Sequence, residues 1–312
     1  MSVPTNSEAP RRVREGPYTA TAAARTGPMQ RVRDYISLLK LRIVLLLDAT
    51  AVAVMIPAAH GHPKLGPVLA VLAGGTLAAG GGHAINCWFD RDIDAEMSRT
   101  RRRPLPDGRI PSAHALVVGI VMNIAAFAVL WAWANLLAAS LALAGTLIYV
   151  FVYTIWLKRS TPHNIVIGGA AGAVPPLVGW AAATGGLDAT ALAFFGVIFF
   201  WTPPHFWALA QMIKGDYARA RIPMLPVVAG ERSAKQQSVV YATATALVSA
   251  VPFLTGAAGP IYLAGAAVLG IGLVGITILD LSGRRWTRRG FAYSIVYVAA
   301  LFGLFAASPL LS

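Results

Sequence analysis

Three side chains that carry oxygen ligands follow one another at four-residue intervals near the end of a long apolar run: Asn86, Asp90 and Asp94. If the helix before them continues, this spacing places them on one face, with Asp92 pointing roughly the opposite way. Two carboxylates and an amide oxygen are hard ligands, which suit a Mg²⁺ ion that is shared with substrate phosphates. The spacing predicts a magnesium site for a phosphorylated substrate; a solvated acidic helix end paired with its own arginines is the alternative.

Basic residues accompany these acids. Six arginines lie between positions 91 and 109, and cations of this kind bind diphosphate oxygens. A second polar cluster, residues 214–221, contains Lys214, Asp216 and Arg219. We expect it to add one carboxylate and further cations on the opposite wall of the same site, where a second magnesium ion could bind.

The elements that must position these clusters are membrane-spanning helices. Crossing about 30 Å of hydrocarbon takes about 20 helical residues, and nine apolar runs are long enough. The predicted spans are 41–59, 66–86, 114–135, 138–157, 164–184, 188–210, 236–257, 260–281 and 290–310. Both polar clusters follow even-numbered spans, so an all-α polytopic fold brings them to the same membrane surface.

The distribution of charge gives the orientation. The chain has 312 residues, 56% hydrophobic and 12% charged, with a formal net charge of +13. All of the 26 Lys and Arg residues except Lys64 lie in the N-terminal segment or in alternate loops. The positive-inside rule therefore predicts a multi-pass protein of the cell inner (plasma) membrane, with a cytoplasmic N-terminus, a periplasmic C-terminus and an active site on the cytoplasmic side. No basic face is left for nucleic acid, which excludes nucleic-acid binding.

The remaining features set the domain organisation. Residues 1–33 contain arginines but no apolar core, so we expect a disordered basic cytoplasmic tail, although a short organellar transit peptide has a similar composition. Residues 34–312 would form one nine-helix transmembrane domain. Cys87 is the single cysteine, which excludes an intrachain disulfide and a metal site built from cysteines.

The pattern Asn86-x-x-x-Asp90-x-x-x-Asp94 on an even-numbered span, with nine spans in all, resembles the UbiA superfamily of intramembrane prenyltransferases. Further stretches are similar to one family within it, the protohaem IX farnesyltransferases (haem O synthases). They are 90–94, 99–100 with 103–106, 153–154 with 157–159, 164–169, 201–210 and 222–228. The resemblance covers roughly residues 35–305, so a chance match to one motif does not explain it.

The resemblance implies a UbiA-like bundle that transfers a farnesyl group from farnesyl diphosphate to a vinyl group of haem b. Water addition then gives haem O. It also implies catalytic residues that hold Mg²⁺, a clamp for the diphosphate, and contacts to the prenyl chain or haem. The catalytic and metal residues would be Asn86, Asp90, Asp94 and Asp216. The clamp would be Arg42, Arg91, Lys158, Arg159, Lys214 and Arg219. The prenyl and haem contacts would be His83, Tyr153, His205 and Trp207. Partners would be the lipid bilayer and haem A synthase or terminal-oxidase assembly factors.

Two stretches depart from the family pattern. The first span begins Leu39-Lys40-Leu41-Arg42, where the family usually has a proline between the two cations. Asp216 stands alone, where the superfamily typically has two aspartates four residues apart. A second magnesium site is therefore incomplete, and the roles of Lys214 and Arg219 are weaker than that of Asp90.

Several residues have two interpretations. His83 and His205 could contact the haem iron, although a lone histidine in a span more often makes a hydrogen bond. Glycine-rich runs at 74–75, 80–82 and 168–172 could form a groove for the prenyl chain or could pack helices together.

Other functions would use these residues differently. A UbiA-type enzyme that prenylates 4-hydroxybenzoate or another tetrapyrrole would share the magnesium site and differ in the acceptor pocket. An ion-coupled transporter would use the intramembrane carboxyls of Asp48 and Asp280. A CDP-alcohol phosphotransferase would need an Asp-Gly-x-x-Ala-Arg element ahead of Asp90, which the sequence lacks. A haem-handling assembly subunit without catalysis would not need Asp90 or Asp94.

Overall fold

The computed structural model describes residues 27–283 and 286–311. The first 26 residues of the predicted tail lie outside this part of the chain. The rest of that segment is not a tail, because helix α2 (Pro28–Leu38) begins inside it. Proline at the first helical position suits a helix start, and Asp34 of α2 pairs with Arg109, whose Nε lies 3.1 Å from its Oδ2. This tertiary contact was not visible in the sequence.

Within the described residues, nine helices are long and apolar enough to cross a membrane, and they agree with the nine predicted spans. They are α3 (Leu41–Ala58), α4 (Leu65–Phe89), α6 (Ser112–Trp133), α7 with η1 (Leu136–Leu147 and Ile148–Leu157), α8 (Asn164–Thr184), α9 (Ala189–Met212), α12 with α13 (Gly230–Val248 and Val251–Leu254), α14 (Pro260–Leu281) and α15 (Thr287–Leu311). The seventh begins at Gly230, earlier than predicted.

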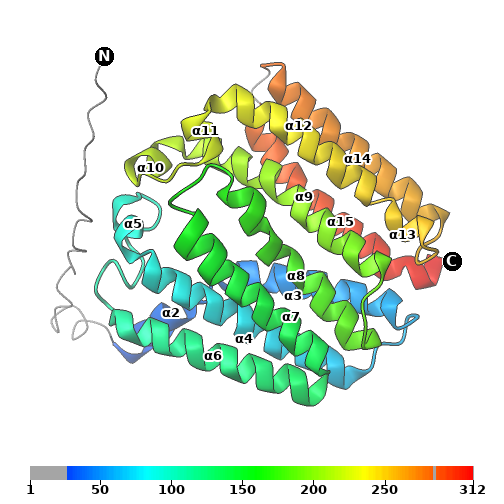
Figure 1. The fold of residues 1–312 in the computed structure, drawn as a ribbon, viewed down its shortest axis with the longest axis horizontal. Helices are drawn as coiled ribbons and strands as arrows, with labels where there is room; N and C mark the ends of the chain where they lie inside the picture. Colours follow the sequence, from blue (N-terminus) through cyan, green and yellow to red (C-terminus); the bar gives the residue numbers. More distant parts are fainter. Residues whose placement is uncertain (1–26, 284–285, 312) are drawn as a thin grey trace.

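The spans form one bundle with α8 and α9 at its centre (Figure 1). Helix α8 packs against α3, α7 and α9, while α9 also packs against α12 and α15. Gly179 permits the crossing of α8 and α3, because a Cβ there would lie 2.0 Å from the Ala51 carbonyl oxygen. The outer helices expose apolar side chains such as Ile124 and Ile271, as expected of a surface that faces lipid.

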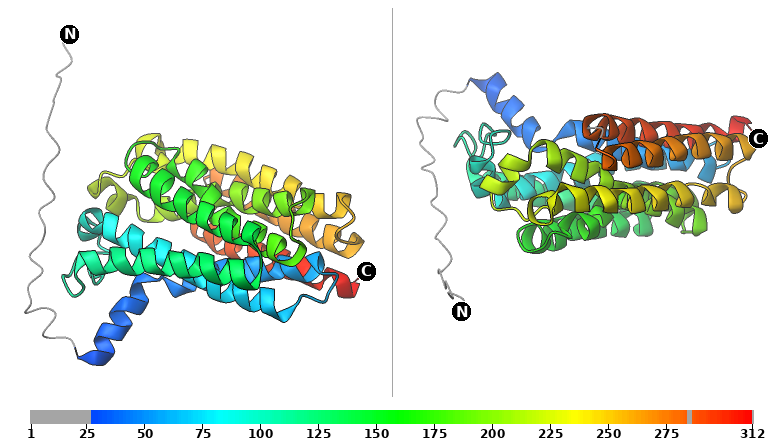
Figure 2. Two further views of the ribbon diagram at one scale, coloured as in Figure 1. Left: turned by 60° about the horizontal axis from the view of Figure 1, so that its bottom comes forward. Right: turned by 90° about the horizontal axis from the view of Figure 1, so that it is seen from above.

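Three short helices gather at one end of the bundle: α5 (Arg91–Glu96), α10 (Lys214–Arg219) and α11 (Leu225–Val228). Figure 1 shows them at the end opposite the C-terminus, and we call this the polar end. Figure 2 shows α2 projecting from the bundle at an angle to the spans. The segments around α5 and α10 share an apolar cluster that includes Ile93, Met97 and Tyr217. The two polar clusters of the sequence therefore meet at one end, as predicted.

Candidate active site

A cavity of about 980 Å³ extends from the polar end into the bundle. Its walls come from α3, α4, α7, η1, α8 and α9, together with the loop after α5. We call five of the polar side chains that line its polar end the mouth residues; apolar and small side chains line most of the remainder. The mouth residues are Lys40, Asn86, Asp94, Arg103 and Lys158.

The acidic motif keeps its four-residue repeat across a helix boundary. Helix α4 ends at Phe89 and α5 begins at Arg91, but the Asp90 amide still donates to the Asn86 carbonyl at 2.9 Å. The Asp94 amide donates to the Asp90 carbonyl at 2.8 Å. Asn86, Asp90 and Asp94 are all buried. The sequence spacing therefore predicted their shared face correctly.

Asp92 points away from this face, also as predicted. Its carboxylate accepts two bonds from the Arg159 guanidinium, at 2.7 and 2.8 Å, and is about a third exposed. Burial by itself would raise the pKa of Asp92, but the hydrogen bonds and charge of Arg159 lower it overall. Arg159 thus closes the outer side of the motif and does not line the cavity.

Asp90 is buried behind the mouth residues and does not line the cavity. Its Oδ2 accepts from the Asn86 side-chain amide at 2.7 Å and forms an ion pair with Lys158, while Arg159 lies 3.5 Å from Oδ1. Asp94 lies at the cavity surface and accepts from Arg103 at 2.7 Å. Each carboxylate is therefore neutralised by a cation that could instead bind a substrate anion.

Lys158 owes its position to a π-helix, η1, which the sequence prediction of plain α-helix missed. The Lys158 amide donates to the carbonyl of Tyr153, five residues earlier, at 2.8 Å. Thr154 donates to the Tyr149 carbonyl at 2.8 Å, also five residues back, and accepts from the Asn86 side chain at 3.1 Å. The wider turn changes which side chains face α4, and π-helices often occur at functional sites.

Lys40 lines the mouth but was not among the predicted site residues. It has a left-handed backbone conformation, φ 52° and ψ 49°, at the turn between α2 and α3. Its ammonium donates to Asn86 Oδ1 at 3.0 Å. Burial lowers the pKa of Lys40, because the charged form loses hydration. Arg42, which we predicted as part of the diphosphate clamp, is exposed on the rim of the same cavity.

The second polar cluster reaches the polar end, as predicted, but its carboxylate does not line the cavity. Asp216 does not line the cavity; its two oxygens accept from the Ser98 hydroxyl at 2.9 and 2.7 Å, and Arg219 forms an ion pair with it. The hydrogen bond from Ser98 is the main cause of the lowered pKa of Asp216. Lys214 lies near the surface, 3.5 Å from Glu231. The carboxylate that we predicted for a metal instead fastens the loop after α5 to α10.

Two further predicted contacts lie away from the cavity. Arg91 donates to the Trp88 carbonyl at 2.7 Å and lies over the Trp88 ring. Trp207 is fully buried against Tyr241, with ring centroids 5.6 Å apart. Two residues along a helix correspond to about 200° of rotation, so Trp207 faces α12 when His205 faces the cavity.

Three predicted prenyl or haem contacts do line the cavity: His83, Tyr153 and His205. The His83 ring nitrogen Nδ1 lies 3.2 Å from the Tyr149 hydroxyl, and Tyr149 stacks on Tyr153 with centroids 5.8 Å apart. Asp48 lines the deeper part and accepts from Thr76 at 2.6 Å. The site thus combines a cationic mouth with an aromatic wall.

The mouth fits a magnesium ion in the chemistry of its donors. No three Asp, Glu, His or Cys side chains come together to hold a metal within residues 27–283 and 286–311. Asn86 and Asp94 nevertheless offer hard oxygen atoms at the cavity surface, and Mg²⁺ usually keeps waters and takes other ligands from substrate phosphates. Asp90 could contribute only in competition with Lys158, which holds its Oδ2.

Solved structures with the same fold are prenyltransferase-related. A digeranylgeranylglyceryl phosphate synthase matches 91% of this chain and 100% of its own, with a TM-score of 0.76 and 17% identity. A UbiA homologue from Archaeoglobus fulgidus, bound to DMAPP and Mg²⁺, matches 87% of this chain and 99% of its own, with a TM-score of 0.61 and 18% identity. At these identities the likeness concerns the fold.

Sequence relatives are much closer. Protoheme IX farnesyltransferase from Symbiobacterium thermophilum is 50% identical over 287 residues, which cover 91% of this chain and 96% of the relative. The protein of the same name from Roseiflexus sp. (strain RS-1) is 51% identical over 274 residues, 87% of this chain, but the match spans about half (51%) of that relative's length. The family model of the UbiA prenyltransferases matches residues 47–296. With its spans, its fold and these relatives in agreement, the chain is a multi-pass membrane protein that belongs to the UbiA prenyltransferase family.

Proposed function

We propose that this protein transfers a farnesyl group from farnesyl diphosphate to a vinyl group of protohaem IX, with addition of water, giving haem O and diphosphate. The observation that carries the proposal is the cavity, which joins a cationic mouth to a long, mostly apolar interior. A prenyl diphosphate has the matching shape: a multiply charged head on an apolar tail. The names of the relatives at about 50% identity supply the acceptor.

The mouth residues would bind the diphosphate. Lys40, Arg103 and Lys158 line the mouth of the cavity together with one carboxylate, Asp94, while the other lining carboxylate, Asp48, lies deeper. The excess of cations suits an anionic head group, and charge-assisted hydrogen bonds to phosphate are strong. Lys158 and Arg103 each leave a carboxylate partner when they turn to the substrate. That carboxylate is then available to a cation that accompanies the diphosphate.

Asn86 and Asp94, with Asp90 behind them, would hold a Mg²⁺ ion. When bound, this ion offsets the negative charge that develops on the departing diphosphate. Thr154 orients the Asn86 amide, because it accepts from Nδ2 and so directs Oδ1 toward the mouth. The side chains themselves would bind and align the head group and keep the carbon chain in the apolar part.

The interior has room for a second large substrate. A volume of about 980 Å³ lies at the upper end of the range of about 300–1,000 Å³ for ligand pockets. The aromatic rings of Tyr149, Tyr153 and Trp201 on its walls would contact a flat macrocycle or an isoprenoid chain. We place the polar end at the cytoplasmic side of the inner membrane, because the basic residues gather there.

The proposal is tested by reconstituting the purified protein in vesicles with haem b, farnesyl diphosphate and Mg²⁺, and analysing the extracted haem by mass spectrometry. We expect a product heavier than haem b by one farnesyl group and one water. Chelation with EDTA should abolish it, and added Mg²⁺ should restore it. An Asp90→Ala, Asp94→Ala double variant serves as the inactive control.

Two results would contradict the proposal. If haem b is unchanged but 4-hydroxybenzoate becomes prenylated under the same conditions, the acceptor is a different one within the same family. If the double variant turns over haem b as fast as the unmodified protein, the mouth is not the catalytic site.

A further inference from the structure

Aromatic stacking and a hydrogen bond hold the ring of His205 in the wall of the large cavity. Its ring lies between two aromatic rings, with Trp201 at 4.3 Å and Phe291 at 4.6 Å between centroids and both nearly parallel to it. Trp201 is itself fixed, because its indole donates to the Ser294 carbonyl at 2.7 Å. Helices α9 and α15 thus set the plane of the imidazole.

The hydrogen bonds around Ser294 also set the tautomer. A serine hydroxyl has one proton to donate, and Ser294 gives it to the Phe291 carbonyl at 2.7 Å. We assign the histidine as the donor in the contact of 2.7 Å between Ser294 Oγ and His205 Nδ1, because the Phe291 carbonyl can only accept and takes the hydroxyl proton. With the proton on Nδ1, the lone pair of the neutral ring lies on Nε2. No described residue hydrogen-bonds to that nitrogen, and His205 lines the cavity.

The depth of His205 matches the reacting end of the substrate. Asn86 lies three residues before the end of α4, about 5 Å along the axis, and His205 lies seven residues before the end of α9, about 10 Å along it. His205 thus lies farther from the end of its helix than Asn86 does, and both line the same cavity. The first carbons of a prenyl chain would reach this level when the diphosphate is bound by Lys40 and Lys158.

We propose that His205 is the base that accepts the proton from the water that adds to the vinyl group. This inference rests on the proposed function. The terminal vinyl carbon forms a bond to farnesyl C1 as the bond from C1 to diphosphate oxygen breaks, which leaves a cation on the inner vinyl carbon. Water oxygen then bonds to that carbon while His205 Nε2 takes one water proton. The products are the hydroxyethylfarnesyl haem, diphosphate and a protonated imidazole.

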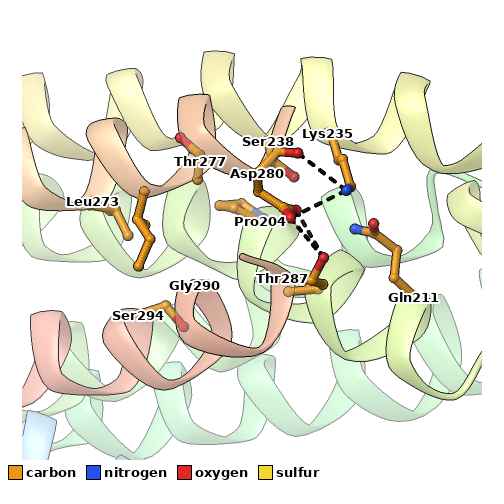
Figure 3. Close-up of a pocket in the computed structure, with 12 residues that line it drawn as sticks. Pro204, Gln211, Lys235, Ser238, Leu273, Thr277, Asp280, Thr287, Gly290 and Ser294 are labelled. Carbon is orange, nitrogen blue, oxygen red and sulfur yellow. Dashed lines mark hydrogen bonds and ion pairs between the residues drawn. The ribbon is translucent and has the colours of Figure 1, made fainter. Parts of the chain in front are cut away.

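A second, small pocket borders Ser294 and is lined by polar and apolar side chains. It has a volume of about 30 Å³, enough for about two waters. Figure 3 shows Ser294, Gln211 and Asp280 around it, with Asp280 joined to Lys235 and Thr287. The buried Gln211 Oε1 has no partner within the described part of the chain. Waters in this pocket would take the proton toward the Asp280 carboxylate once the Ser294 hydroxyl turns from Phe291 to the pocket. Asp280 accepts from Lys235 at 3.2 Å and from Thr287 at 2.9 Å.

The test measures which haem product forms. A cation that gains no water can instead lose a proton from the new methylene group, giving an alkene lighter than the normal product by one water. His205→Phe keeps the aromatic stack but removes both ring nitrogens, and His205→Gln is the milder alternative if the first variant folds poorly. In the reconstituted reaction we expect the ratio of hydrated to dehydrated product to fall by about tenfold or more.

Two companion variants sharpen the result. Ser294→Ala removes the acceptor that fixes the tautomer, so we expect a smaller fall in the same ratio. His163→Gln, in an exposed loop, should leave the ratio unchanged. Binding of farnesyl diphosphate to each variant, measured by titration, shows whether the cavity is intact.

Three outcomes are distinct. A hydrated product at the normal ratio from His205→Phe and His205→Gln would refute the base while leaving the proposed function in place. Loss of haem binding in both variants, seen in the absorption spectrum, would refute it in favour of a haem-binding role. If the unmodified protein makes no prenylated haem at all, it is the proposed function that fails.

Discussion

The two polar clusters at the polar end have similar compositions and opposite uses. Between positions 86 and 94, two carboxylates and an amide lie on one buried face at or just behind the cavity. Between 214 and 221, the single carboxylate turns toward the loop after α5, and the cations turn outward. Acidic and basic residues at a membrane surface therefore do not define a site by themselves. What differs is whether the side chains lie at the cavity or bind a neighbouring loop away from it.

The largest difference between the clusters should appear when an acid is neutralised. Asp94→Asn removes a charge at the cavity surface that faces Arg103, and Asp90→Asn leaves the partly buried Lys158 without its partner. We expect each to lower kcat/KM for farnesyl diphosphate by about 10³-fold, or about 4 kcal/mol in activation free energy. The product is measured by mass spectrometry of extracted haem. A loss below tenfold in a folded variant would remove the distinction between the clusters.

The cations of the mouth should show a smaller but specific effect. Lys40→Met removes a charged donor that lies partly buried beside Asn86, whereas Arg42→Met changes an exposed residue on the rim. A charge-assisted hydrogen bond is worth about 2 kcal/mol, so KM for farnesyl diphosphate should rise by about 30-fold for Lys40→Met and by less than about threefold for Arg42→Met. Steady-state kinetics with varied diphosphate substrate would measure both. Equal effects would mean that the left-handed turn at Lys40 has no special role.

Asp216→Asn should act mainly on stability. The substitution weakens the bonds from Ser98 and Arg219 that fasten the loop after α5, without touching the cavity. We expect the unfolding temperature to fall by about 2–4 °C and kcat/KM to fall by less than about fivefold. Thermal unfolding in detergent and the same haem assay would be compared with Asp94→Asn. A loss of activity as deep as that of Asp94→Asn, with stability unchanged, would make Asp216 a catalytic residue after all.

The smallest effect is expected at Trp207. Trp207→Phe keeps most of the contact with Tyr241 and lies outside the cavity, so KM for both substrates should stay within about twofold of normal. Its matched partner is Tyr153→Leu, on the cavity wall, which should raise KM for the substrates. If Trp207→Phe changes KM more than Tyr153→Leu does, our assignment of the two faces of the helices is wrong.

The sequence alone determined the nine-span architecture and the shared face of the acidic motif. Nine apolar runs of sufficient length became nine spans in the described part of the chain, because each helix must satisfy its own backbone hydrogen bonds in lipid and so depends on local composition. The common face of Asn86, Asp90 and Asp94 also followed from local spacing, since backbone bonds preserve the four-residue repeat across the α4–α5 junction. Length, charge distribution and helical period were enough for these features.

Only the tertiary structure decided which other side chains complete the site. Lys40 reaches Asn86 through a left-handed turn that has no periodic signal in the sequence. Lys158 was predicted for the diphosphate clamp, but neither its π-helix nor its ion pair with Asp90 was. Asp216 does not join the site because its carboxylate binds the hydroxyl of Ser98, 118 residues earlier in the sequence. A side chain binds whatever partner the packed helices bring within about 3 Å, and that choice depends on the relative rotation and depth of whole helices, which no short stretch of sequence specifies.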